Sequence, residues 1–233
     1  MHMFSFLDSV LRRDDDFAKR LADPAEARRF IRSSLLWLTL LGAFYGLVMG
    51  SFQLFRTGSG WNAITSMIKV PILLLMTTAL CFPALYIFGL AGGAKLRAHS
   101  LWAALLGSHV VLTLSLAALS PIVFFFLTTV NSYVAVKFIH VIVWGFAGLA
   151  GLKFLRGILR HLDPDLTKNA RLMTLWMLLF ALVGMQGSWM LRPFIGRPNQ
   201  EFRAFRYLDG NIFEDLGRSM WRMGHGSPKK PRP

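Results

Sequence analysis

The sequence predicts an all-α fold: a polytopic membrane helix bundle with about five transmembrane helices and an interfacial amphipathic helix at each end. Hydrophobic residues make up 54% of the 233-residue chain and charged residues only 16%, whereas soluble domains carry roughly 25% charged residues. No Asp or Glu occurs between Glu26 and Asp163. An ionised group costs about 2.5–3.5 kcal/mol at the bilayer centre, so a stretch without carboxylates fits a lipid environment and not a soluble surface.

Residues 1–32 precede the membrane and form an amphipathic region that we expect in the cytoplasm. Apolar side chains recur there at helical spacing, at Phe4, Phe6, Leu7, Val10 and Leu11. They predict a short helix that lies on the bilayer surface or against a partner. A second helix start follows: Asp23 suits the N-cap, Pro24 the first helical position and Glu26 the third. We expect this helix to run directly into the first span.

Residues 33–192 form the predicted five-helix transmembrane domain. Its apolar segments are 34–52, 68–90, 101–128, 133–155 and 172–191. A helix needs about 20 such residues to cross a bilayer, so each segment qualifies. The third is long enough to tilt, or to bend near Pro121. Only residues 130–132 separate the third from the fourth, so these two should form an antiparallel hairpin.

Basic residues indicate the orientation. The predicted connections on the N-terminal side hold fourteen Lys and Arg, and those on the opposite side hold three. This bias predicts a cytoplasmic N-terminus, and five crossings then place the C-terminus outside. Nine further basic residues lie in residues 192–233, which conflicts with that location. The alternative is that one segment does not cross.

The exported tail has its own predicted features. A tail motif comprises Arg192, Pro193, Gly196, Gly210 and Asn211. Within the tail region 193–223 we expect an interfacial helix at about 212–223, and residues 224–233 should be disordered.

The net charge of +14 does not favour nucleic-acid binding, because the basic residues flank apolar runs instead of forming one face. Catalysis is disfavoured as well, since the spans contain no carboxylate and the chain has no catalytic or metal-binding motif. We expect no enzyme activity, no catalytic or metal-binding residues and no cofactor. In the pair Ser108-His109, adjacent helical positions point about 100° apart. The serine should therefore bond its own helix and the histidine should face a neighbouring helix.

Two sets of residues are candidates for a role inside the membrane. The first is a polar cluster of Lys137, His140 and Gln186, which could line a path or bind an anion. Lys69 and Lys137 should lie near the outer surface and extend their ammonium groups toward it. The second set consists of glycines that permit close helix packing, within the bundle or against another subunit: Gly42, Gly46, Gly50, Gly148, Gly151, Gly184 and Gly187.

Several short motifs resemble those of known membrane families. Lys69-Val70-Pro71, Phe82-Pro83-Ala84-Leu85-Tyr86, Gly92-Gly93-Ala94-Lys95 and Ser120-Pro121 look like motifs of Yip1-type five-span proteins. The whole chain, including Gly187–Phe194 and Gly210–Phe213, is similar to a largely uncharacterised bacterial membrane family. Some members of that family are labelled actin-binding for a WH2 motif, an element that this sequence does not show. The resemblance implies a five-span bundle in a bacterial inner membrane and a membrane-organising role.

The sequence therefore predicts a non-enzymatic membrane scaffold or accessory subunit. Its partners would be the lipid bilayer and other membrane protein subunits or a second copy of itself, with no nucleic acid. It would present the glycine face of the first span, the N-terminal amphipathic helix and the exported tail. The alternative is a channel or transporter component for an ion or small solute.

Overall fold

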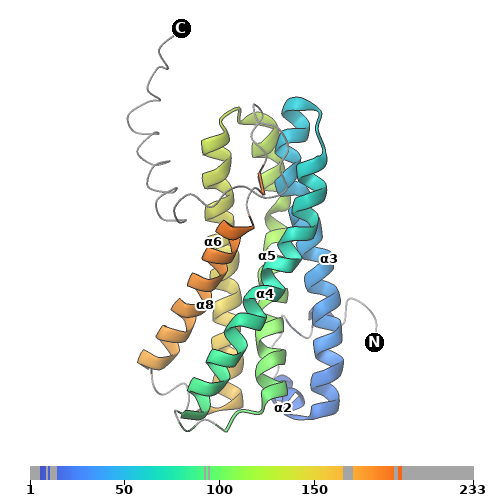
Figure 1. The fold of residues 1–233 in the computed structure, drawn as a ribbon. Coiled ribbons are helices and arrows are strands. Elements are labelled where there is room, and N and C mark those ends of the chain that lie inside the picture. Colours follow the sequence, from blue (N-terminus) through green and yellow to red (C-terminus); the bar gives the residue numbers. More distant parts are fainter. Residues whose placement is uncertain are drawn as a thin grey trace.

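The computed structural model describes residues 6–8, 10, 15–91, 93, 95–164, 170–191 and 194–195. Within these residues every regular element is a helix (Figure 1). They are α2 (Asp15–Ala22), α3 (Pro24–Thr57), α4 (Trp61–Ala91), α5 (Ala98–Thr129), α6 (Tyr133–Leu162) and α8 (Ala170–Met190). Helices α3 to α6 contain 30 to 34 residues each and are long and apolar enough to cross a membrane. The predicted all-helical membrane fold is confirmed at this level.

The last apolar segment forms a shorter helix. α8 has 21 residues, and its apolar stretch is Thr174–Ser188. At 1.5 Å per residue, α8 is about 31 Å long, which is close to the thickness of the hydrocarbon core of a bilayer, about 30 Å. The structure thus has four long apolar helices that are able to span a membrane and one shorter apolar helix, where the sequence predicts about five spans.

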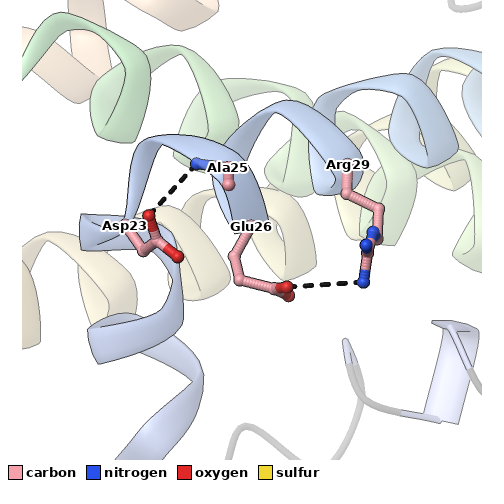
Figure 2. A network of polar contacts seen from close by, with 4 residues as sticks. All are labelled: Asp23, Ala25, Glu26 and Arg29. Carbon is pink, nitrogen blue, oxygen red and sulfur yellow. Dashed lines mark hydrogen bonds and ion pairs between the residues drawn. The ribbon is translucent and has the colours of Figure 1, made fainter.

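The start of α3 follows the predicted capping signal. The side chain of Asp23 accepts a hydrogen bond from the backbone N–H of Ala25 at 3.1 Å (Figure 2). The carboxylate of Glu26 pairs with Arg29 on the next turn at 3.4 Å. α3 continues from this start through the first apolar segment without interruption. The end of the segment that precedes the first span and the span itself therefore share one helix, as expected.

Short connections join the long helices. Gly58 ends α3 with a φ of 75°, and its N–H donates to the carbonyl of Leu54 at 3.0 Å. This left-handed conformation suits glycine. Between α5 and α6, the Ser132 side chain accepts from the N–H of Ala135 at 3.4 Å and begins α6. The tight hairpin predicted for these two helices is confirmed.

The bundle is built around α3 and α5. α3 packs along both α4 and α5, and α6 packs on the other side of α5 (Figure 1). Large side chains between these helices are fully buried, among them Tyr45, Phe52, Leu105 and Leu116. α8 packs mainly against α4 and makes few contacts with α6. It is the least embedded of the apolar helices.

One end of the bundle is closed by α2, and we call it the basic end for the charges described below. The carbonyl of Leu21 accepts from the Ser100 hydroxyl at 2.8 Å, and the carbonyl of Ala22 accepts from Arg97 at 3.1 Å. The ring of Phe17 packs edge-on against Phe30 of α3, with ring centroids 5.3 Å apart. The C-terminal carbonyls of α2 are therefore bonded to α5.

The N-terminal apolar face is not free for the bilayer or a partner, so that expectation is wrong for its described part. Phe6 and Val10 are buried in the same core cluster as the bundle helices. The Phe6 ring lies 5.2 Å from that of Phe30. The aromatic cluster at the basic end gives these side chains an apolar environment within the chain itself. Phe4 and Leu11 lie outside the described residues.

Candidate functional site

Polar side chains inside the bundle are joined in pairs across helices. The Tyr45 hydroxyl on α3 lies 2.9 Å from Nδ1 of His140 on α6. The Thr78 hydroxyl on α4 lies 2.9 Å from Nδ1 of His109 on α5. Hydrogen bonds of this kind hold neighbouring membrane helices together by about 0.6–2 kcal/mol each. The arrangement is a set of separate ties between helices and not one polar cavity.

His109 has a hydrogen-bond pattern that indicates its tautomer. The Thr78 hydroxyl donates to the carbonyl of Leu74 at 2.9 Å, so its oxygen is free to accept from the histidine. Nδ1 of His109 also lies 3.2 Å from the carbonyl of Leu105. A proton on Nδ1 satisfies both acceptors, so we assign it there. The ring of Phe180 from α8 packs against this histidine at 5.1 Å.

The prediction for the Ser108-His109 pair is confirmed. The Ser108 hydroxyl donates to the carbonyl of Leu105 in its own helix at 2.7 Å. His109 turns to α4, as its contact with Thr78 shows. The two side chains serve different neighbours, and they do not form a dyad.

One member of the predicted polar cluster is tied to another helix. His140 contacts Tyr45 of α3, whose hydroxyl lies 2.9 Å from Nδ1 of the histidine. Lys137 is half-buried near the start of α6, and Gln186 is half-buried on α8, a helix with few contacts to α6. His140 is buried, and its Nε2 atom makes no hydrogen bond with the described part of the chain.

The glycine face of α3 packs against α4 of the same chain. A Cβ atom added at Gly46 would lie 2.3 Å from the carbonyl oxygen of Ser66, and one at Gly50 would lie 2.4 Å from that of Asn62. Gly42 faces Pro71 at an ordinary contact distance. Because backbone of the same chain fills this space, the geometry agrees with packing within the bundle, which is the first of the two predicted alternatives. This face forms the closest approach within the bundle.

The other candidate glycines fall into three groups. Gly151 packs closely on α5, where a Cβ would lie 2.8 Å from the Ser108 carbonyl oxygen. Gly184 and Gly187 lie on the contact of α8 with α4, and a Cβ at Gly187 would be 2.9 Å from Leu73. Gly148 has nothing within 4 Å of its missing Cβ. Only this last position leaves room for a neighbour.

Lys69 is buried by the chain that follows α8. Only 5% of the residue is exposed, and its ammonium lies 5.9 Å from the centre of the Phe194 ring. The hydroxyl of Ser66, one turn earlier on α4, donates to the carbonyl of Phe194 at 2.6 Å. The chain that follows α8 therefore packs against the first part of α4. This contact is invisible in the sequence because its partners lie 128 positions apart.

Exposed cations gather at the basic end. In the described part of the chain the exposed basic residues are Arg20, Arg28, Arg29, Arg32, Lys95, Arg97, Lys153, Arg156 and Arg160. At the opposite end, Arg56 is half-buried, and its guanidinium donates to the carbonyl of Val130 at 2.8 Å. The basic residues that the sequence assigns to one side of the membrane are thus exposed together at one end of the bundle.

Two expectations fall on residues that the structure does not describe. The tail motif Arg192, Pro193, Gly196, Gly210 and Asn211, and the tail regions 193–223 and 224–233, lie outside the described residues except for Phe194 and Ile195. Among the residues that are described, no three His, Cys, Asp or Glu side chains gather as a metal site.

No protein-family model, curated protein or solved structure matches this chain. The resemblances to the Yip1-type proteins and to the bacterial family stay predictions.

Proposed function

We propose that this polytopic membrane protein is a non-enzymatic scaffold or accessory subunit that binds other membrane proteins. The observation that carries the proposal is the use of its interior polar groups. Tyr45 with His140, and Thr78 with His109, tie helices together in pairs, and the spans between Glu26 and Asp163 contain no carboxylate. Such an interior supports a packing role better than chemistry or ion coupling, which usually rests on intramembrane acidic groups.

The surface that we assign to partners is the outer face of α8. Leu175, Leu178, Leu182 and Met185 recur at spacings of three and four residues and are all exposed. α8 is held mainly by α4, so its opposite face has no neighbour among the described helices. The glycine face of α3 and the N-terminal apolar face are both occupied within the chain, which leaves α8 as the stronger candidate.

Site-specific photocrosslinking in native membranes tests this role. A photoreactive residue at Leu178 should give an adduct with another polypeptide, and that polypeptide should copurify with the tagged chain in mild detergent. The matched control is Leu101, which is fully buried on α5 and should give no intermolecular adduct. A chain that purifies alone, with no adduct from any exposed position of α8, would contradict the scaffold role.

We also propose that α8 is a fifth crossing, with the N-terminus in the cytoplasm and the C-terminus outside. The exposed cations at the basic end support the first part. The second part is supported by Phe194, whose carbonyl is bonded to Ser66, close to the residue at which α4 begins. After α8 the chain thus continues toward the end opposite the cations. The resemblance to the bacterial family adds an inner-membrane location.

A transport role is the second candidate. It is favoured by the Nε2 atom of buried His140, which has no hydrogen-bond partner in the described part of the chain. Purified protein in liposomes would then conduct an ion or small solute. Flux that falls after Lys137→Ala or Gln186→Ala would support this role, because the sequence predicts that these two side chains line a path. Absence of flux for a panel of ions and small solutes would exclude it.

A further inference from the structure

One outward line of α6 changes from apolar to basic along its length. Its members recur at spacings of three and four residues, which places them on one side of a helix. We call this line the α6 stripe: Ile142, Phe146, Leu149, Lys153, Arg156 and Arg160. Ile142, Phe146 and Leu149 are 56%, 66% and 58% exposed, and the three cations are also exposed. The stripe is therefore a continuous surface.

The opposite side of α6 holds the helix in the bundle. Gly151, Phe154 and Ile158 are buried, and Phe154 packs edge-on against Phe17 of α2, with ring centroids 6.3 Å apart. Because these residues face inward, the stripe points away from the bundle. Changes along it should leave the packing of α6 intact.

The cations of the stripe have no acidic partner in the described part of the chain. The nearest carboxylate in the sequence, Asp163, is buried and accepts a hydrogen bond from the backbone N–H of Lys95 at 2.8 Å. The helix dipole favours cations only in the last turn of a helix. Because α6 ends at Leu162, the dipole explains only the position of Arg160. Lys153 and Arg156 lie farther from that end. The charge bias that orients a membrane protein depends on the number of basic residues on each side. It does not explain why these cations lie on one face of α6.

We propose that the α6 stripe binds an anionic phospholipid. The phosphate would lie among Lys153, Arg156 and Arg160, where a guanidinium can donate two parallel hydrogen bonds to phosphate oxygens. An acyl chain would lie along Leu149, Phe146 and Ile142. Each half of the stripe is about 10 Å long at 1.5 Å per residue. The charged half can therefore contact the headgroup, and the apolar half an acyl chain, of one lipid that lies parallel to the helix. An acidic protein would be attracted by the charges, but the apolar half would offer it no complementary group.

The proposal depends on the chain crossing a membrane and not on its role as a scaffold. With the N-terminus in the cytoplasm, the bound lipid belongs to the cytoplasmic leaflet. A failure of partner crosslinking would leave the lipid site in place, and loss of the lipid site would leave the crosslinking result in place.

Native mass spectrometry of the full-length chain in detergent provides the test. Phosphatidylglycerol and phosphatidylcholine with identical acyl chains are titrated separately. Because three cations attract an anionic headgroup, we expect at least about tenfold tighter binding of the anionic lipid. The variant K153Q/R156Q/R160Q should bind both lipids equally, and K153R/R156K/R160K should keep the preference.

The matched control is R28Q/R29Q/R32Q, which removes three cations from the same end of the bundle. The carboxylate of Glu26 already pairs with Arg29 in α3. The control should therefore keep most of the preference.

An equal loss in both triple variants would show general charge attraction and overturn the site. Displacement of the lipid by inorganic phosphate alone would also overturn it, because the apolar half would then contribute nothing. A preference that survives in K153Q/R156Q/R160Q would show that these cations do not cause it and would overturn the site too.

Discussion

Single glycines in this chain differ in what lies opposite their missing Cβ atoms. At Gly46 and Gly50 the neighbour is the backbone of α4, and at Gly148 there is none within 4 Å. A side-chain tip can rotate away from an added methyl group, but a helix backbone must move as a whole. The same residue type is therefore indispensable at two positions and dispensable at a third.

Gly46→Ala should destabilise the bundle by about 1–3 kcal/mol, the usual cost of overpacking. The added Cβ would overlap the Ser66 carbonyl, and α3 and α4 would have to separate. Thermal unfolding in detergent, followed by tryptophan fluorescence, should show a clearly lower Tm. Gly148→Ala is the control and should leave Tm unchanged or raise it, since Ala favours helix by up to about 1 kcal/mol over Gly. Equal Tm values for the two variants would contradict the packing described here.

Tyr45→Phe should cost about 1 kcal/mol of stability, because it removes the hydrogen bond between α3 and α6 and leaves Nδ1 of His140 without its hydroxyl partner. The same thermal unfolding assay measures this loss. Tyr86→Phe is the control: that ring stacks on Phe82 with centroids 5.8 Å apart, and the phenyl ring can keep this contact. A Tyr45→Phe variant as stable as Tyr86→Phe would mean that the buried hydrogen bond contributes nothing.

The residue scale also shows where reasoning from sequence ends. The behaviour of Ser108 and His109 could be predicted, because it follows from the angle between adjacent positions of one helix. The partner of His140 could not, because Tyr45 lies 95 positions earlier and nothing local marks it. A histidine in an apolar segment indicates that it has a hydrogen-bond partner. Which residue is the partner depends on how the helices pack.

At the scale of elements, helices are longer than the apolar segments that reveal them. The first segment, residues 34–52, belongs to a helix that covers Pro24–Thr57. Apolar composition marks the part in contact with lipid or core, whereas the helix continues wherever backbone hydrogen bonds continue. The capping signal at Asp23 marked the true start because it reports on the backbone. The end at Gly58 depends on a left-handed turn that composition does not show.

The attachment of α8 depends on a narrow contact with α4, and Gly187 is its tightest point. Gly187→Val should force Leu73 and Met76 outward and loosen α8 alone. Hydrogen exchange should become at least about tenfold faster for amides of α8, while amides of α5 stay protected. Gly184→Val serves as the control, since its nearest neighbour, Thr77, lies at an ordinary 3.8 Å and leaves more room. Equal acceleration in α5 and α8 would show that α8 is not a separate unit of stability.

For the whole molecule, the defining property is the separation of charge from the lipid-facing surface. Exposed cations occupy one end, and exposed apolar side chains cover the outer faces of the spans, for example Leu40, Ile72, Phe125 and Leu178. This pattern could be predicted from the sequence because it depends on composition along the chain. The side on which the tail lies could not, because basic residues and the number of crossings disagree.

Cysteine labelling with a membrane-impermeant maleimide tests the whole topology. Asn131→Cys in the turn between α5 and α6, and Ser227→Cys in the tail, should react in intact cells. His161→Cys at the basic end should react only after lysis. The native Cys81 is buried and provides the unlabelled background. Labelling of Ser227→Cys only after lysis would show that α8 does not cross, and a reversed pattern at Asn131 and His161 would invert the orientation.

The way α2 is held has a consequence for how the protein is made. The carbonyl of Leu21 is bonded to Ser100, which is synthesised 79 residues later, and Phe17 packs against Phe154 from the helix after that. Ribosomes add about 5–20 residues per second, so α2 waits for seconds while the four helices α3 to α6 are synthesised. During that interval the side chains of α2 that pack against α5 and α6 lack these partners. Although α2 precedes the long helices in the chain, it is thus among the last to complete its contacts.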